Sequence, residues 1–67
     1  MRIKIIVDGK KFVTKERDDN IEEFSEKFYN YVVNHPHVVA FKSILKDGNI
    51  IVLPAGMVDR SIFIFEN

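Results

Sequence analysis

The sequence has no cysteine and no tryptophan, and it has only two prolines and three glycines. Without cysteine, a disulfide scaffold and a thiolate metal site are both excluded. The glycines are isolated along the chain and do not form a phosphate-binding loop. Tight turns and helix ends must therefore fall at a few marked positions, and the fold must be held by its apolar core.

Long apolar runs are also missing, since none approaches the ~20 residues that a membrane-spanning helix needs. The charged first seven residues lack a signal-peptide pattern. We therefore expect a cytoplasmic protein that has no membrane partner. The formal net charge is zero, with ten basic and ten acidic residues. This balance is unfavourable for a protein that acts mainly by non-specific phosphate binding.

Size and composition indicate one small domain over residues 1–67, with a single apolar core. Hydrophobic residues make up 46% of the chain, and six of them are phenylalanine. Phe, Tyr, Met, Ile, Asn and Lys total 31 residues, whereas Gly, Ala, Arg and Pro total 10. Because AT-rich codons produce this skew, we expect a bacterium of low GC content or a phage as the source.

Residues 20–34 carry the one helical pattern in the chain. Apolar side chains recur at helical spacing and form one stripe, made of Ile21, Phe24, Phe28, Tyr31 and Val32. Two overlapping pairs, Asp19 with Glu22 and Asn20 with Glu23, have the spacing of a capping box. Pro36 prevents the helix from continuing. We predict a helix from Asn20 to Asn34.

Five segments have the β-branched and aromatic content of strands: residues 2–7, 10–15, 38–46, 49–53 and 61–65. Asp8-Gly9 and Asp47-Gly48 each predict a two-residue hairpin turn. The element order is ββαβββ, without repeats or linkers. The predicted fold class is α+β: a mainly antiparallel twisted sheet, or a partly open barrel, with one helix packed on it.

The turns also predict which strand residues share a face. Asp8-Gly9 places Ile5 opposite Phe12 and Ile3 opposite Thr14. The strand pairing that Asp47-Gly48 predicts places one set of side chains on one face of the sheet: Phe41, Leu45, Ile50 and Val52. It places Ile44, Ile51 and Leu53 on the opposite face. The last strand divides in the same way, with Ile62 and Ile64 on one face and Phe63 and Phe65 on the other.

A single helix covers one face of such a sheet, so the second apolar face needs another cover. Three arrangements supply one: a sheet that curls into a barrel, a homodimer packed sheet to sheet, or a different protein partner. We favour the homodimer. Residues 54–60 combine glycine, methionine and arginine, which suits either a recognition loop or a tight connection. The candidate partner-binding residues are Ile44, Ile51, Leu53, Met57, Arg60, Phe63 and Phe65.

Charge is uneven along the chain: residues 1–17 have a net charge of +4 and residues 18–31 a net charge of −4. The simplest interpretation is two solvated surfaces of opposite sign. The alternative is that the basic hairpin binds nucleic acid, since small sheet proteins place such side chains on backbone phosphates. The candidate nucleic-acid-binding residues are Arg2, Lys4, Lys11, Lys15 and Arg17.

No set of residues predicts a catalytic, cofactor or metal site. His35 and His37 lack the further ligands that a zinc site requires. The serines have no histidine or lysine in a recognisable arrangement for nucleophilic catalysis. The sequence therefore predicts a small non-enzymatic interaction module, homodimeric, that binds and modulates another protein. The alternative is a nucleic-acid-binding regulator.

Overall fold

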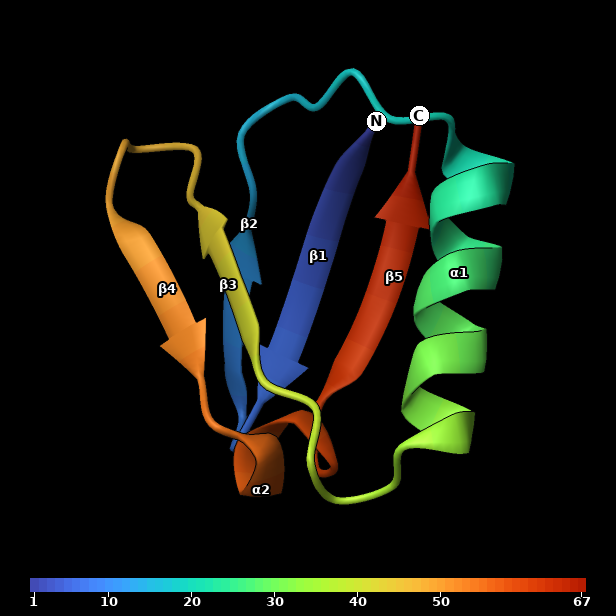
Figure 1. Ribbon diagram of the computed structural model, residues 1–67. Coiled ribbons are helices and arrows are strands. Elements are labelled where there is room, and N and C mark those ends of the chain that lie inside the picture. The colour runs from blue at the N-terminus through green and yellow to red at the C-terminus, as the bar shows by residue number, and fades with distance from the viewer.

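A computed structural model describes all 67 residues. The chain forms one α+β unit with one main helix and antiparallel sheets (Figure 1). Its elements, in order, are β1 (Arg2–Val7), β2 (Lys10–Val13), α1 (Ile21–Asn34), β3 (Phe41–Ile44), β4 (Ile50–Leu53), α2 (Ala55–Val58) and β5 (Ile62–Glu66). The predicted order and fold class are confirmed, with a short second helix added.

Three strands form one sheet in the order β2-β1-β5, and β3 with β4 forms a separate hairpin. Figure 1 shows α1 alongside β5, at the opposite side of the molecule from β4. The sheet and the hairpin meet at an isolated antiparallel bridge between Thr14 and Leu45. No other strand pairing joins the two sheets, so the strands do not close into a barrel. The closed-barrel alternative is therefore wrong.

The first hairpin has the predicted turn and register. Asp8 and Gly9 both have positive φ angles, 50° and 78°, as a type I′ turn requires. Ile5 pairs with Phe12, as predicted. Ile3 and Ile5 are completely buried because they point from the central strand into the core. Phe41, Ile51, Leu53 and Val58 complete that core from the other side.

The second hairpin differs from the prediction by one residue of register. Its turn is a three-residue loop, in which the N–H of Gly48 donates to the carbonyl of Leu45 at 2.9 Å. The N–H of Leu45 donates to the carbonyl of Asn49 at 2.6 Å. Gly48 has a φ of 94°, which fits a turn that ends in a bulge. The Asp47 carboxylate accepts the N–H of Asn49 at 2.9 Å and stabilises this loop.

This shift reverses the predicted faces of β4, because side chains alternate along a strand. Ile51 and Leu53 are buried, at 9% and 2% exposure, and share the core face with Phe41. Ile50 and Val52 are exposed on the outer face. The prediction that grouped Phe41 with Ile50 and Val52 is wrong. Aliphatic residues occupy every position of β4, so their pattern does not specify the register.

Helix α1 begins and ends as predicted. The Asn20 side chain accepts the N–H of Glu23 at 3.0 Å, which confirms one of the two proposed caps. No residue of α1 is buried, however. Phe28 packs against four other phenylalanine rings, at centroid distances of 4.8–6.3 Å from Phe24, Phe41, Phe63 and Phe65. Tyr31, assigned to the apolar stripe, is 57% exposed.

The chain after β4 also departs from the prediction. Residues 55–58, expected to form part of a turn, make the single-turn helix α2. The carbonyl of Pro54 accepts the N–H groups of Met57 and Val58, and Val58 is buried. The predicted third strand is shorter than expected, since residues 38–40 lie outside β3. Neither helix is long and apolar enough to cross a membrane.

Candidate functional site

The outer face of hairpin β3–β4 is an exposed aliphatic surface. Ile44, Ile50 and Val52 are 49%, 61% and 60% exposed. Ile44 pairs directly with Ile50, so the three side chains lie on neighbouring strands of one face. We call these three residues the aliphatic face. Lys42 pairs with Val52 and borders this face, but no other element covers its three aliphatic side chains.

The edge of β4 beside this face has no strand next to it. In an antiparallel ladder, hydrogen-bonded and non-bonded pairs alternate. Leu45 and Asn49 form a hydrogen-bonded pair. Ile51 and Leu53 lie two and four residues after Asn49, so they also direct their backbone groups toward β3. The backbone N–H and C=O groups of Ile50 and Val52 therefore point away from β3. They are open to another strand.

The candidate partner-binding residues do not form one surface. Ile44 is exposed, whereas Ile51 and Leu53 lie in the core and are not accessible to a partner. The other four are distributed over α2, β5 and the segment between them. Met57 packs against the core, and Arg60 donates to the Asp8 carboxylate at 3.2 Å. Phe63 and Phe65 are half-buried against α1.

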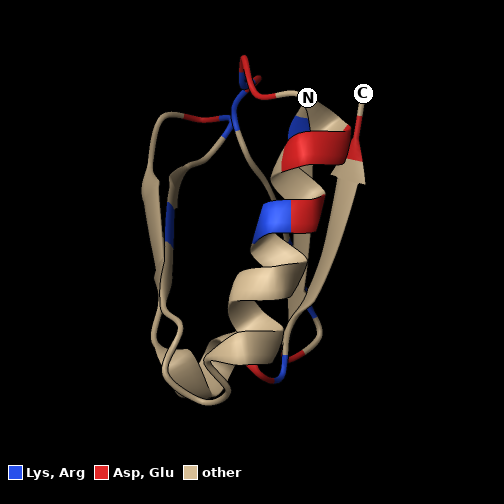
Figure 2. Ribbon diagram, turned by 45° about the vertical axis from the view of Figure 1, so that its right-hand side comes forward, with Lys and Arg blue, Asp and Glu red and all other residues tan.

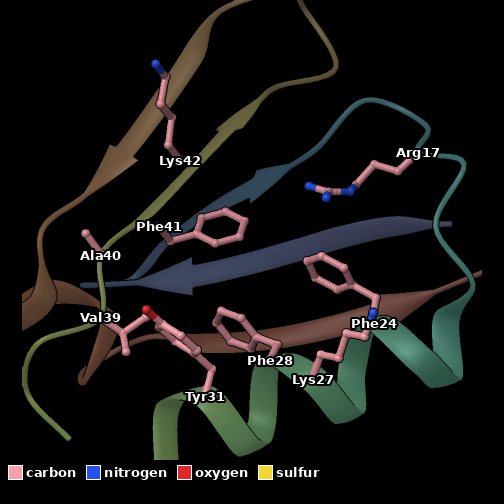
Figure 3. A pocket seen from close by; sticks show the side chains of 9 residues that line it. All are labelled: Arg17, Phe24, Lys27, Phe28, Tyr31, Val39, Ala40, Phe41 and Lys42. Atoms are coloured by element: carbon pink, nitrogen blue, oxygen red, sulfur yellow. The ribbon is translucent and has the colours of Figure 1, made fainter. Parts of the chain in front are cut away.

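A groove of about 390 Å³ runs between α1 and β3 (Figure 3). Its aromatic floor is formed by Phe24, Phe28 and Phe41, which point toward one another from the two elements. Tyr31 and Val39 lie at one end, and Arg17 lies at the other. No acidic residue lines the groove. Its volume falls within the ~300–1,000 Å³ typical of ligand-binding clefts.

Arg17 is held at its end of the groove by three contacts. Its guanidinium lies 4.6 Å from the centre of the Phe24 ring. Its Nε donates to Asp19 at 2.7 Å and its Nη1 to the Ser43 hydroxyl at 3.3 Å. The hydrogen bond from Arg17 holds the pKa of the Asp19 carboxyl below its usual value. The Nη2 group of Arg17 has no acceptor within the chain.

The other candidate nucleic-acid-binding residues lie on the outer face of the three-stranded sheet and at its junction with β3. Arg2 approaches Glu16 at 3.8 Å, and Lys4 approaches Glu66 at 3.6 Å. Lys11 and Lys15 are exposed and form no ion pair. Arg17 differs from them because it faces the groove and is paired with Asp19.

Residues 28–41 contain no lysine, arginine, aspartate or glutamate. In Figure 2 the charged residues of α1 lie in its N-terminal half, and its C-terminal half carries none. Exposed apolar side chains occur within this segment: Tyr29, Tyr31, Val33 and Val38. The groove therefore has Arg17 at one end, uncharged Tyr31 and Val39 at the other, and Lys27 and Lys42 on its two walls.

The two histidines end the helix and anchor the following loop. The N–H of His35 donates to the carbonyl of Tyr31 at 3.0 Å, and its ring stacks on the Tyr31 ring. His37 has a φ of 67°, and its Nδ1 lies 2.7 Å from the Asp59 carboxylate. Their ring nitrogens contact different elements, so the two side chains do not converge on one point.

Sequence reasoning missed the groove and assigned β4 to the wrong face. The uncharged segment 28–41 was a signal for the groove, since it joins an exposed half-helix to the first residue of β3. Phe24 and Phe28 were assigned to the apolar stripe of the helix, and Phe41 to one face of the sheet. The true aliphatic face had no comparable signal, because both registers of β4 bury two aliphatic residues and expose two.

Comparison of the chain with protein-family models, with curated proteins and with solved structures gave no match.

Proposed function

We propose that this chain is a small non-enzymatic interaction module that self-associates along β4 and, as a dimer, binds and modulates another protein. The proposal rests on the aliphatic face and the unpaired edge beside it. Ile50 and Val52 contribute to both, through their side chains and their backbone groups. A cytoplasmic location belongs to the same proposal.

A second copy of the chain fits this edge because antiparallel pairing of β4 with itself has two-fold symmetry. Pro54 follows β4 and has no N–H to donate. One register gives hydrogen-bond partners to the outward-pointing backbone groups of both Ile50 and Val52. This register places Ile50 opposite Val52 of the second copy. The two hairpins then form one continuous four-stranded sheet, and their aliphatic faces become contiguous.

The test is the molar mass in solution, measured by light scattering after size-exclusion chromatography. We expect a dimer for the wild type and a monomer for Val52→Lys, which places a charge on the aliphatic face and edge. Ile62→Lys is the matched control, since Ile62 is 57% exposed on β5, away from β4. It should remain dimeric. Ile51→Lys is unsuitable because Ile51 lies in the core.

A wild-type monomer would refute self-association. A dimer that Ile62→Lys disrupts and Val52→Lys leaves intact would move the interface to the outer face of β5. Circular dichroism of each variant separates loss of the dimer from loss of the fold. These outcomes decide between β4 and the other exposed strands.

Binding of nucleic acid is the second candidate, and one observation favours it. The Thr14–Leu45 bridge brings the end of the basic first hairpin beside β3, so Lys15 lies next to Ile44 and Lys46 next to Val13. Lysines of both hairpins thus lie near one another on the outer surface. Binding of single-stranded DNA that weakens steeply with salt would support this function, and salt-independent binding or none would reject it.

A further inference from the structure

We infer that the groove between α1 and β3 binds an extended peptide segment of a partner protein, with an acidic residue at one end and apolar residues along the rest. This inference rests on the proposed function, because it names the partner-binding site of that interaction module. Helix α1, which forms one wall of the groove, and β4 lie on opposite sides of β3 (Figure 1), so the two sites can be tested separately.

The edge of β3 that borders the groove is open to strand addition. Phe41 and Ser43 direct their backbone groups toward β4, so those of Lys42 point the other way. On that side the carbonyl of Ile44 accepts the N–H of Lys15 at 3.0 Å, and no strand pairs with Lys42. An extended peptide can continue the ladder there by main-chain hydrogen bonds.

The groove floor suits alternate apolar side chains of such a peptide. Phe28 and Phe41 meet at a centroid distance of 5.9 Å in an edge-to-face arrangement and line the groove; Phe28 is half-buried, and Phe41 is 8% exposed. Side chains of an added strand alternate in direction, so every second one would face these rings. Tyr31 is exposed beside them and offers a large, rigid contact surface.

The charge of the groove selects an acidic residue at the Arg17 end. Arg17 keeps its Nη2 group free, and Lys27 on α1 forms no ion pair. Both lie among the lining residues, which include no carboxylate. Lys42 on β3 is a third cation of the lining, whereas Tyr31 and Val39 at the end opposite Arg17 are uncharged. A ligand complementary to this groove is therefore acidic at one end and apolar along the rest.

The test begins with selection from a phage-displayed library of random dodecapeptides against the wild-type protein. We expect enriched peptides in which an acidic residue precedes or follows alternating apolar residues. The strongest peptide is then synthesised with a fluorescein label, and its affinity is measured by fluorescence anisotropy. Its binding site is mapped from amide chemical-shift changes, which should centre on residues 39–42 and on the groove side of α1.

Two pairs of matched variants test the contacts. Lys27→Glu should weaken binding about tenfold or more, the loss expected when one charged hydrogen bond is removed. Lys10→Glu is its control, since Lys10 is exposed and lies outside the groove. Tyr31→Ser should also weaken binding. Tyr29→Ser is its control, because Tyr29 is similarly exposed on the same helix, 64% against 57% for Tyr31, but does not line the groove.

Backbone hydrogen bonding is tested with a peptide N-methylated at alternate residues, which cannot donate along one edge. This peptide should bind at least tenfold more weakly than its parent. The inference is overturned if selection yields no binder, if enriched peptides carry no acidic residue, or if shifts map outside the groove. It is also overturned if the N-methylated peptide binds as tightly as the parent.

The same titration on Val52→Lys separates this inference from the proposed function. If that monomeric variant binds the peptide with unchanged affinity, the groove acts independently of self-association. If the wild type is monomeric and still binds the peptide, the dimer is refuted and the groove stands. If the wild type is dimeric and no peptide binds, the groove is refuted and the dimer stands.

Discussion

Thr14 Oγ1 accepts a hydrogen bond from the backbone N–H of Ile3 at 2.9 Å, and both residues are completely buried. The N–H of Thr14 donates to the carbonyl of Ile3, also at 2.9 Å. Thr14 is thus attached to β1 by its side chain and its backbone. It is also the bridge residue to Leu45. This one residue joins the three-stranded sheet to the second hairpin.

Thr14→Val should therefore destabilise the fold although it preserves the side-chain shape. It leaves the buried N–H of Ile3 without an acceptor, which costs about 1–3 kcal/mol. Urea denaturation followed by circular dichroism measures the loss. Thr14→Ser keeps the hydroxyl and should lose less than Thr14→Val. Equal stability of Thr14→Val and the wild type would show that the hydrogen bond does not support the junction.

Gly48 should be the glycine that is most sensitive to substitution in the second half of the chain. Its φ of 94° is strained for any residue with a Cβ, so Gly48→Ala should cost on the order of 1–3 kcal/mol. Gly56 in α2 has no positive φ and no atom within 4 Å of an added Cβ. Gly56→Ala should therefore be neutral or stabilising. A reversed order in urea denaturation would contradict the three-residue loop.

The Arg17–Asp19 pair should be visible in the titration of Asp19. Hydrogen bonding to Arg17 lowers the pKa of this carboxyl below 3.8. The folded state therefore holds fewer protons there than the unfolded state, and the pair stabilises the fold above the ordinary pKa of aspartate. That contribution is lost as the pH falls through the lowered pKa.

NMR titration of the Asp19 side chain should show this lowered pKa in the wild type and a return toward 3.8 in Arg17→Gln. Lys10→Gln is the control and should leave the titration of Asp19 unchanged. Because Asp19 lies near the surface, the accompanying change in stability should be small. An unchanged pKa in Arg17→Gln would show that Arg17 does not hold the carboxylate in solution.

Helix α1 should open more readily than β1. None of its residues is buried, whereas Ile3 and Ile5 of β1 are completely buried at the centre of the sheet. Segments with few buried contacts open locally at a lower free energy than the core. Native-state hydrogen exchange should give lower opening free energies for the amides of α1 than for those of β1. Equal values for both elements would indicate a single cooperative unit.

The sequence predicted what local chemistry determines. Asn20 and Pro36 set the ends of α1, and Asp8-Gly9 set the register of the first hairpin. Each of these signals acts within a few residues, so tertiary packing did not change it. The fold class followed from the same signals, since the apolar periods of the helix and the strands were both clear.

The register of the second hairpin could not be predicted in the same way. Asp47-Gly48 fits a two-residue turn and also fits a three-residue loop that ends at Gly48. The choice between them depends on packing, because the observed loop buries Phe41, Ile51 and Leu53 together against β1. The groove also arises from tertiary structure, since it depends on how far β3 lies from α1.

The most direct test of the proposed dimer is a disulfide between two copies of the chain. Because the wild type has no cysteine, Ile50→Cys and Val52→Cys each introduce a single thiol. The proposed register places these positions opposite each other, about 5.5 Å apart between Cα atoms, within the range for a disulfide. Mild oxidation of the two variants mixed together should give mainly the mixed disulfide dimer, in preference to either homodimer. Ile62→Cys mixed with Val52→Cys should give no such preference. Absence of a preferred mixed dimer would contradict pairing along β4.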